Sequence, residues 1–257
     1  MKMGLLFLVS LMLAGCVTTA SNSNQSVEQS PAYRAKLHTE LGATYFSRGA
    51  YVVALHELNT AISDDEDYAP AYGMLGLVYF HFHENDKAEI NFRKALTLTP
   101  NDPDLLNNYG WFVCQARDPS KSISYFRHAW ENPLYATPEK AYDNGGVCAL
   151  KMGNPSAADE DFHEALKANP QDAIAIYQLA ELYFKQGNNT DANIFLIRLF
   201  RTVGDTPEGL WLGVRLAHRE HLGKAQQAYS SRLLKEYPDS SQAKALRHGK
   251  WNNKASS

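Results

Sequence analysis

The amino-acid sequence predicts an all-α fold, a solenoid of about six stacked helix pairs. Three observations predict it: a motif that recurs about every 34 residues, small residues at one fixed place in each block, and prolines that close several of the blocks. Self-similarity at a period of roughly 20 to 50 residues is typical of repeat architectures, in which each unit packs only on its neighbours.

The first half of each block carries the motif, a bulky or small residue followed by glycine or alanine. A glycine inside a helix costs about 1 kcal/mol relative to alanine, so its repetition indicates a place where a second helix comes close. The copies are Leu41-Gly42-x-x-Tyr45, Leu75-Gly76-x-x-Tyr79, Tyr109-Gly110, Gly145-Gly146 and Leu179-Ala180-x-x-Tyr183.

The second half of each block predicts the partner helix. Small residues recur at one position, Ala54, Ala88, Ser122, Ala158 and Ala192, and bulky residues follow four positions later, Leu58, Phe92, Phe126, Phe162 and Leu196. Pro100, Pro170 and Pro238 then stand where a helix has to end before the next begins.

This pattern resembles the tetratricopeptide repeat from Ala35 to about Ser240. The resemblance implies a right-handed superhelix whose first helices line a concave groove for a peptide or a partner helix. We expect units near 35–68, 69–102, 103–138, 139–172, 173–206 and 207–240, followed by a polar tail over 241–257. The sixth unit is looser and is expected to be the cap, with Leu210, Val214 and Ala217 in its first helix and Ser230 and Leu233 in its second.

The N-terminus predicts an exported protein. A lysine at position 2 precedes the apolar run Leu5–Leu13, which is too short to span a bilayer but suits a signal peptide over 1–15. The run ends in Leu13-Ala14-Gly15-Cys16, which resembles the lipobox of bacterial lipoproteins. That resemblance implies acyl chains on Cys16; the alternative is an ordinary signal with an incidental cysteine.

The residues around the expected anchor suggest its destination. Val17 stands where lipoproteins retained in the inner membrane commonly carry aspartate, so the resemblance implies the outer membrane, on its periplasmic face. The polar stretch that follows, up to residue 30, is expected to be a flexible tether. A formal net charge of −3 at pH 7 argues against nucleic acid as a partner.

The first helix of the third unit, "LNNYGWFVC" from Leu106 to Cys114, carries unusual groove residues. In the repeat frame Asn107, Trp111 and Cys114 face the groove. Cys114 and Cys148 lie 34 residues apart, in adjacent first helices and in an oxidising compartment, which favours a disulfide. Two buried thiols are the alternative.

Five side chains are candidates for binding a partner in the groove: Phe46, Leu77, Phe80, Asn107 and Trp111. Apolar and aromatic groups on a face that the repeat does not need for its own core are typical of binding surfaces. The alternative is that Phe46 and Phe80 simply pack between neighbouring first helices. Units five and six offer a second patch, Tyr177, Phe184, Trp211 and Arg215.

Signals for chemistry are weak. His81 and His83 would point apart on a helix, and His218 and His221 lack the glutamate of a zincin motif. We find no catalytic or nucleotide-binding motif. We therefore expect no enzyme activity, no metal, no cofactor besides the lipid and no small-molecule substrate.

Three stretches carry a more specific resemblance. "NDPDLLNNYGWFVC", the loop sequence "NPLY" and "AYDNGGVCAL", after a lipobox and a short tether, resemble the type IV pilus biogenesis and stability lipoproteins of the PilF/PilW pilotin family. The resemblance implies a protein that binds the pilus secretin, carries it to the outer membrane and promotes its multimerisation. An adaptor for peptidoglycan enzymes or for β-barrel assembly is the alternative.

Overall fold

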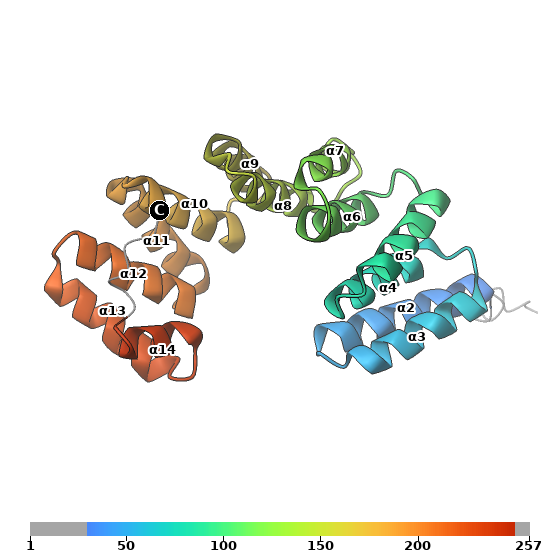
Figure 1. The fold of residues 1–257 in the computed structure, drawn as a ribbon, viewed down its shortest axis with the longest axis horizontal. Coiled ribbons are helices and arrows are strands. Elements are labelled where there is room, and N and C mark those ends of the chain that lie inside the picture. The colour runs from blue at the N-terminus through green and yellow to red at the C-terminus, as the bar shows by residue number, and fades with distance from the viewer. Residues whose placement is uncertain (1–29, 250–257) are drawn as a thin grey trace, which may run out of the picture.

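A computed structural model describes residues 30–249 of the chain. Within this range thirteen α-helices follow one another along an arc from α2 to α14 (Figure 1). The signal peptide, Cys16, nearly all of the tether and the last eight residues lie outside the described residues. The helices are α2 (Pro31–Ser47), α3 (Tyr51–Asp64), α4 (Ala69–His81), α5 (Asn85–Leu98), α6 (Pro103–Ala116), α7 (Pro119–Trp130), α8 (Pro138–Lys151), α9 (Pro155–Ala168), α10 (Ala173–Gln186), α11 (Asn189–Val203), α12 (Pro207–Arg219), α13 (Gly223–Glu236) and α14 (Ser241–Arg247).

Consecutive helices pack as antiparallel pairs, α2 with α3 through α12 with α13, and each pair packs on the next. The first helices of neighbouring pairs also touch, as α2 does α4 and α6 does α8. The predicted all-α superhelix of six helix pairs is therefore confirmed.

Close approach at the repeated glycines holds the first four pairs together. An added Cβ would lie 2.7 Å from the Leu58 side chain at Gly42, 2.8 Å from Phe92 at Gly76, 2.8 Å from Phe126 at Gly110 and 2.6 Å from Phe162 at Gly146. All four large side chains are fully buried. Packed interiors leave no room for these side chains to move aside. Each glycine therefore allows its two helices to cross this closely.

Helix ends follow from the loop sequences. Asp102, Asp118 and Asp172 each accept a backbone N–H of the first turn, which satisfies a donor that would otherwise have no partner. Proline occupies the first position of α6 and α7, where no intrahelical N–H is needed. The short loops thus set where each unit turns.

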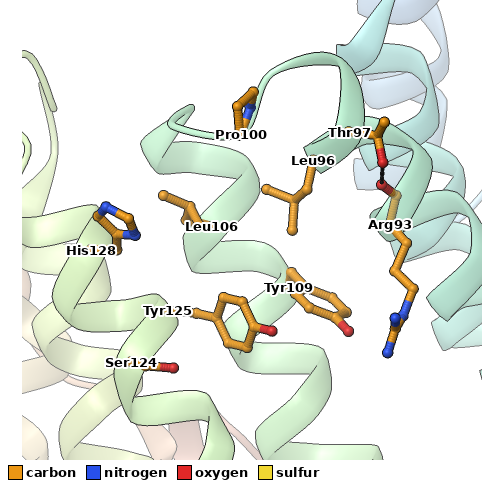
Figure 2. A pocket seen from close by; sticks show the side chains of 9 residues that line it. All are labelled: Arg93, Leu96, Thr97, Pro100, Leu106, Tyr109, Ser124, Tyr125 and His128. Carbon is orange, nitrogen blue, oxygen red and sulfur yellow. Dashed lines mark hydrogen bonds between the residues drawn. The ribbon is translucent and has the colours of Figure 1, made fainter.

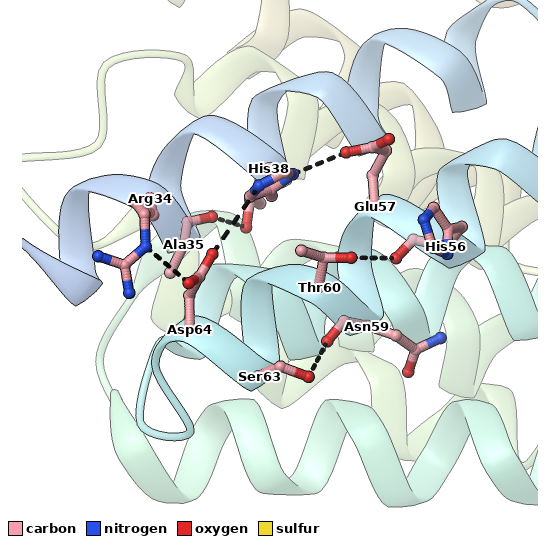
Figure 3. Close-up of polar contacts among 10 residues, drawn as sticks. Arg34, Ala35, His38, His56, Glu57, Asn59, Thr60, Ser63 and Asp64 are labelled. Atoms are coloured by element: carbon pink, nitrogen blue, oxygen red, sulfur yellow. Dashed lines mark hydrogen bonds and ion pairs between the residues drawn. The ribbon is translucent and has the colours of Figure 1, made fainter. Parts of the chain in front are cut away.

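Ion pairs tie together the two helices of the first unit (Figure 3). Arg34 Nε of α2 lies 2.7 Å from Asp64 Oδ1 of α3. His38 lies between two carboxylates, its Nδ1 2.7 Å from Glu57 Oε2 and its Nε2 3.8 Å from Asp64 Oδ2. These contacts link α2 to α3.

The C-terminal end differs from the expected polar tail over 241–257. Residues 241–247 form helix α14, which packs on α12 and α13. Ala243 is fully buried with Leu210 and Leu233, and Leu246 packs against the same cluster. The alanine and leucine spacing, at i and i+3, buries one face of this short helix and closes the last pair.

We predict that Gly146→Ala lowers stability by about 1–3 kcal/mol, because the new Cβ would overlap the buried Phe162 ring. Alanine's better helix propensity of about 1 kcal/mol is outweighed. Gly223→Ala is the matched control, because nothing lies within 4 Å of a Cβ there. Urea titrations that gave both variants the same midpoint would contradict this account of the crossing.

Candidate partner-binding face

A disulfide joins the third and fourth units at the centre of the arc. Cys114 near the end of α6 is bonded to Cys148 of α8, with their Cα atoms 6.1 Å apart. Both cysteines are fully buried, and Phe126 completes the cluster. The hydroxyl oxygen of Ser122 lies 3.0 Å from Cys148 Sγ. The bridge therefore links the one junction that carries a two-residue insertion.

Lys151 reinforces this junction. Its ammonium donates to the carbonyl oxygens of Cys114 at 2.9 Å and Gln115 at 3.2 Å, which lie in the last turn of α6. A cation at the negative end of a helix dipole is favourable. Sequence reasoning missed this contact, although the lysine stands three residues after Cys148.

Asn107 belongs to the packing of the same junction. Its side chain is only 5% exposed, and its Oδ1 accepts a hydrogen bond from Asn144 Nδ2 of α8 at 2.9 Å. The buried side chain of Asn107 differs from the groove-facing residue that we expected. Asn107 joins α6 to α8, and Asn144 is the partner that the sequence pattern did not indicate.

The apolar candidates of units two and three are half-buried between successive first helices. Leu77 and Phe80 of α4 pack against the cluster that contains Phe112, and the Phe80 and Phe112 rings meet edge to face at 5.5 Å. Trp111 packs on the cluster around the disulfide. Each side chain therefore supports the stacking of units while part of its surface remains open.

Phe46 of the first unit belongs to an aromatic group at the end of α2. Its ring contacts Tyr51 edge to face at 5.4 Å and His81 at 6.2 Å. His81 stacks on Tyr51 at 3.7 Å. Phe46 is half-buried, so here too packing between units uses part of the side chain.

The second patch comes together on α10 and α12. Arg215 of α12 pairs with the buried Glu181 of α10, and its guanidinium lies 4.9 Å from the Phe184 ring and 5.9 Å from the Trp211 ring. Tyr177 donates to Glu181 at 3.2 Å. Burial, with the Glu181 charge nearby, raises the pKa of Tyr177 well above its usual range.

Asp143 is a buried carboxyl group that sequence reasoning did not single out. It lies on α8, is 3% exposed, and neither carboxyl oxygen has a hydrogen-bond partner within residues 30–249. Burial, reinforced by the neighbouring Asp172 and Glu139, raises its pKa to about 8. The group is therefore largely neutral in the folded protein at pH 7.

The described residues contain neither a candidate metal site nor a helix that could span a membrane. Across 30–249, no three His, Cys, Asp or Glu side chains are grouped so as to hold a metal ion. Over the same range, no helix has the length and apolar character to cross a bilayer.

The helix pairs and their glycine crossings define a tetratricopeptide-repeat protein. Family models described as tetratricopeptide repeat match residues 69–102 and residues 149–210. Several solved repeat proteins have a similar architecture, and two of those with the highest TM-scores also resemble the chain in sequence.

Those two structures are pilus proteins. The crystal structure of PilW, a widely conserved type IV pilus biogenesis factor, has a TM-score of 0.75 at 28% identity, over 83% of this chain and 98% of PilW. The structure of Pseudomonas aeruginosa PilF has a TM-score of 0.72 at 25% identity, over 85% of this chain and 99% of PilF.

The sequence comparison agrees with the structural one. The type IV pilus assembly protein PilF of Pseudomonas aeruginosa is 26% identical over 239 residues, which are 93% of this chain and 95% of PilF. The chain is thus a tetratricopeptide-repeat protein that closely resembles the PilF/PilW type IV pilus assembly proteins over most of its length. The resemblance that the sequence motifs indicated is confirmed.

We predict that replacing Cys114 and Cys148 by serine lowers stability by about 3–4 kcal/mol, the chain-entropy value for a loop of this size. Reduction of the unmodified protein is the control, because it opens the bridge without changing the side-chain shape. A reduced protein, shown by thiol titration to be open, that melted at an unchanged temperature would contradict the expected contribution.

We predict that Asp143→Asn flattens the dependence of stability on pH. The folded pKa of about 8 lies above the unfolded value near 3.9. Asp143 therefore does not destabilise the fold below about pH 4, and its contribution becomes increasingly unfavourable as pH rises to 8. The loss approaches about 1.4 kcal/mol per pH unit, and the asparagine variant lacks it.

Asp161→Asn is the matched control for this pH experiment. Burial, with Glu160 and Glu164 nearby, raises the pKa of Asp161 only to about 6. The difference in unfolding free energy between Asp161→Asn and the unmodified protein is therefore constant above about pH 7. The corresponding difference for Asp143→Asn keeps growing to about pH 8. Melting temperatures whose Asp143→Asn difference did not change between pH 5 and 8 would contradict the raised pKa.

Proposed function

We propose that this protein is an outer-membrane lipoprotein that binds the secretin of a type IV pilus and promotes its localisation and multimerisation. The observation that carries the proposal is the resemblance to PilF and PilW over nearly the whole chain, in sequence and in fold. Secretin binding, the lipid on Cys16 and the periplasmic face of the outer membrane are the proposed specifics.

Two parts of the chain would have different roles, membrane anchoring at Cys16 and partner binding in the repeat domain. A lipidated Cys16 would supply the destination, because several acyl chains together hold a protein to a membrane far longer than one chain does. The repeat domain would bind the partner. Unfolded or partly assembled secretin subunits expose strand edges, which aggregate unless another surface covers them.

The half-buried side chains Phe46, Leu77, Phe80 and Trp111 are the proposed contacts. Each lies on a first helix, packs against a buried cluster and keeps part of its apolar surface open. Apolar and aromatic anchors of this kind dominate the energetics of protein interfaces. Asn107 is proposed to hold the junction beneath them through Asn144 rather than to touch the partner.

The alternative, an adaptor for peptidoglycan enzymes or β-barrel assembly, keeps the same anchor and the same face. We favour the secretin because PilF, which is similar to 93% of this chain, and PilW, which is similar to 83% of it, are type IV pilus proteins.

We predict that Leu77→Ser reduces heat-resistant secretin multimers in cells several-fold, while secretin monomers persist. Ile90→Ser is the matched control: Ile90 is 67% exposed on α5 and away from the proposed contacts. Circular dichroism and an intact disulfide establish that both variants fold. Unchanged multimers in the Leu77→Ser strain and in a strain lacking the protein altogether would refute the proposed function.

We predict that Cys16→Ala leaves secretin multimers in the inner membrane instead of the outer membrane, because the anchor that sets the destination is gone. Fractionation of the envelope on a density gradient measures the distribution. Secretin that reached the outer membrane in normal amounts with an unacylated protein would contradict the anchoring role.

A further inference from the structure

An acidic pocket lies over helix α9, which runs along the outer side of the arc (Figure 1). Its volume is about 600 Å³. Four carboxylates and two stacked aromatic rings line it, together with a single lysine. The lining residues are Trp130, Tyr142, Asp159, Glu160, Asp161, His163, Glu164, Lys167 and Tyr183. None of them is among the side chains proposed to contact the secretin.

The two stacked rings form one wall of the pocket. Trp130 of α7 lies on Tyr142 of α8, with ring centroids 4.6 Å apart and planes 11° from parallel. Both residues are half-buried, so part of each ring stays open to the pocket. The face of an aromatic ring attracts a cation because its π electrons are negative. Within residues 30–249, however, no lysine or arginine lies over either ring.

Other units supply such a cation themselves. In unit two, Lys94 of α5 lies over the Tyr72 ring of α4, with its Nζ 5.6 Å from the ring centroid. In units five and six an arginine stands at the position of the lysine, and each lies over a ring, Arg198 over Phe195 and Arg232 over Phe200. The residues of unit four that are equivalent to Lys94 and Tyr72 are Glu164 and Tyr142. Unit four therefore keeps the ring and has a carboxylate in place of the cation.

A second carboxylate takes the place of a ring. Figure 2 shows the equivalent surface at the junction of units two and three, where Tyr125 of α7 packs on Tyr109 of α6 with ring centroids 4.8 Å apart. In unit four these two positions hold Asp161 and Gly145. A Cβ on Gly145 would lie 3.0 Å from Asp161 Oδ2 and 3.2 Å from Trp130 Cζ3. The carboxylate and the indole therefore adjoin the same backbone position of α8.

Carboxylates outnumber cations at this pocket. Lys167 is engaged by Glu164, with Nζ 2.5 Å from Oε1. Within the described part of the chain, Glu160 and Asp161 have no ion pair. Burial, with Glu160 and Glu164 nearby, raises the pKa of Asp161 to about 6. A cation placed beside Asp161 would favour its ionised form, so the carboxylate and a bound cation would stabilise each other.

We propose that this pocket binds an arginine side chain from a basic segment of a partner protein. The guanidinium would lie against the rings of Trp130 and Tyr142 and pair with the Asp161 carboxylate. Its planar shape suits both contacts, because a guanidinium stacks on aromatic faces and donates to carboxylates from its edge. Charge complementarity selects this occupant, because three of the four carboxylates have no lysine or arginine partner among residues 30–249.

The test uses a blocked peptide as the probe, acetyl-Ser-Gly-Arg-Gly-Ser-amide. The same peptide with citrulline in place of arginine is the control, because citrulline has nearly the same shape and no charge. The readout is the indole N–H resonance of Trp130 in the full chain at pH 7.5. The arginine peptide is expected to shift this resonance in a saturable way, and the citrulline peptide is not.

Two variants change the pocket in different ways. Asp161→Asn removes the charge beside the rings and keeps the shape of the side chain. Glu164→Lys places over Tyr142 the cation that Lys94 supplies over Tyr72, so the chain would cover its own ring. Glu236→Lys is the matched control, because it makes the same change of charge at an exposed position of α13.

We expect arginine-peptide binding to weaken about five-fold in Asp161→Asn and about ten-fold in Glu164→Lys, and to be unchanged in Glu236→Lys. If one pocket variant does not fold, the other decides the question. The proposal is overturned if Trp130 shows no saturable shift, if the citrulline peptide shifts it equally, or if a folded pocket variant binds like the unmodified protein. It is also overturned if Glu236→Lys weakens binding as much as Glu164→Lys, because the peptide would then respond only to the net charge of the chain.

Discussion

The close crossing of two helices at a glycine is the constraint on which this structure depends. At the glycine crossings the missing Cβ leaves room for one large side chain, as Gly146 does for Phe162, and the pair can then bury its apolar faces. In unit five the small side chain of Ala180 stands at the same place. A single pair buries too little to be stable alone, so the pairs stack and share their cores. The arc, its two faces and the surfaces available to a partner all follow from repeating that contact.

The junction of units three and four differs from the others because its loop carries a two-residue insertion. The insertion in its loop breaks the 34-residue spacing. Three contacts hold this junction together: a disulfide, a lysine that donates to the end of α6, and a hydrogen bond between Asn107 and Asn144. These contacts fix the centre of the arc covalently and by hydrogen bonds. Side chains that look functional in the sequence, such as Asn107, thus serve to keep the two halves of the molecule in a defined relation.

The sequence was sufficient to predict the fold because small residues that recur with the period mark the helix crossings directly. It also singled out Cys114 and Cys148, since their spacing equals one repeat. The sequence did not distinguish exposed from buried side chains on the first helices. Asn107 and Phe80 occupy positions that face a neighbouring helix as well as solvent, and the packing of that helix decides how far each is buried. The burial of Asp143 arises from contacts between units, such as its closeness to Asp172, which the pattern of a single unit does not contain.

Photo-crosslinking in cells tests the central claim most directly, namely that the open apolar surface of the first helices is where the partner docks. A photoreactive phenylalanine analogue in place of Leu77 is predicted to crosslink to a secretin subunit, and the same analogue in place of Ile90 on the outer helix is predicted not to. Crosslinking to the secretin from position 90 with none from position 77 would contradict the account.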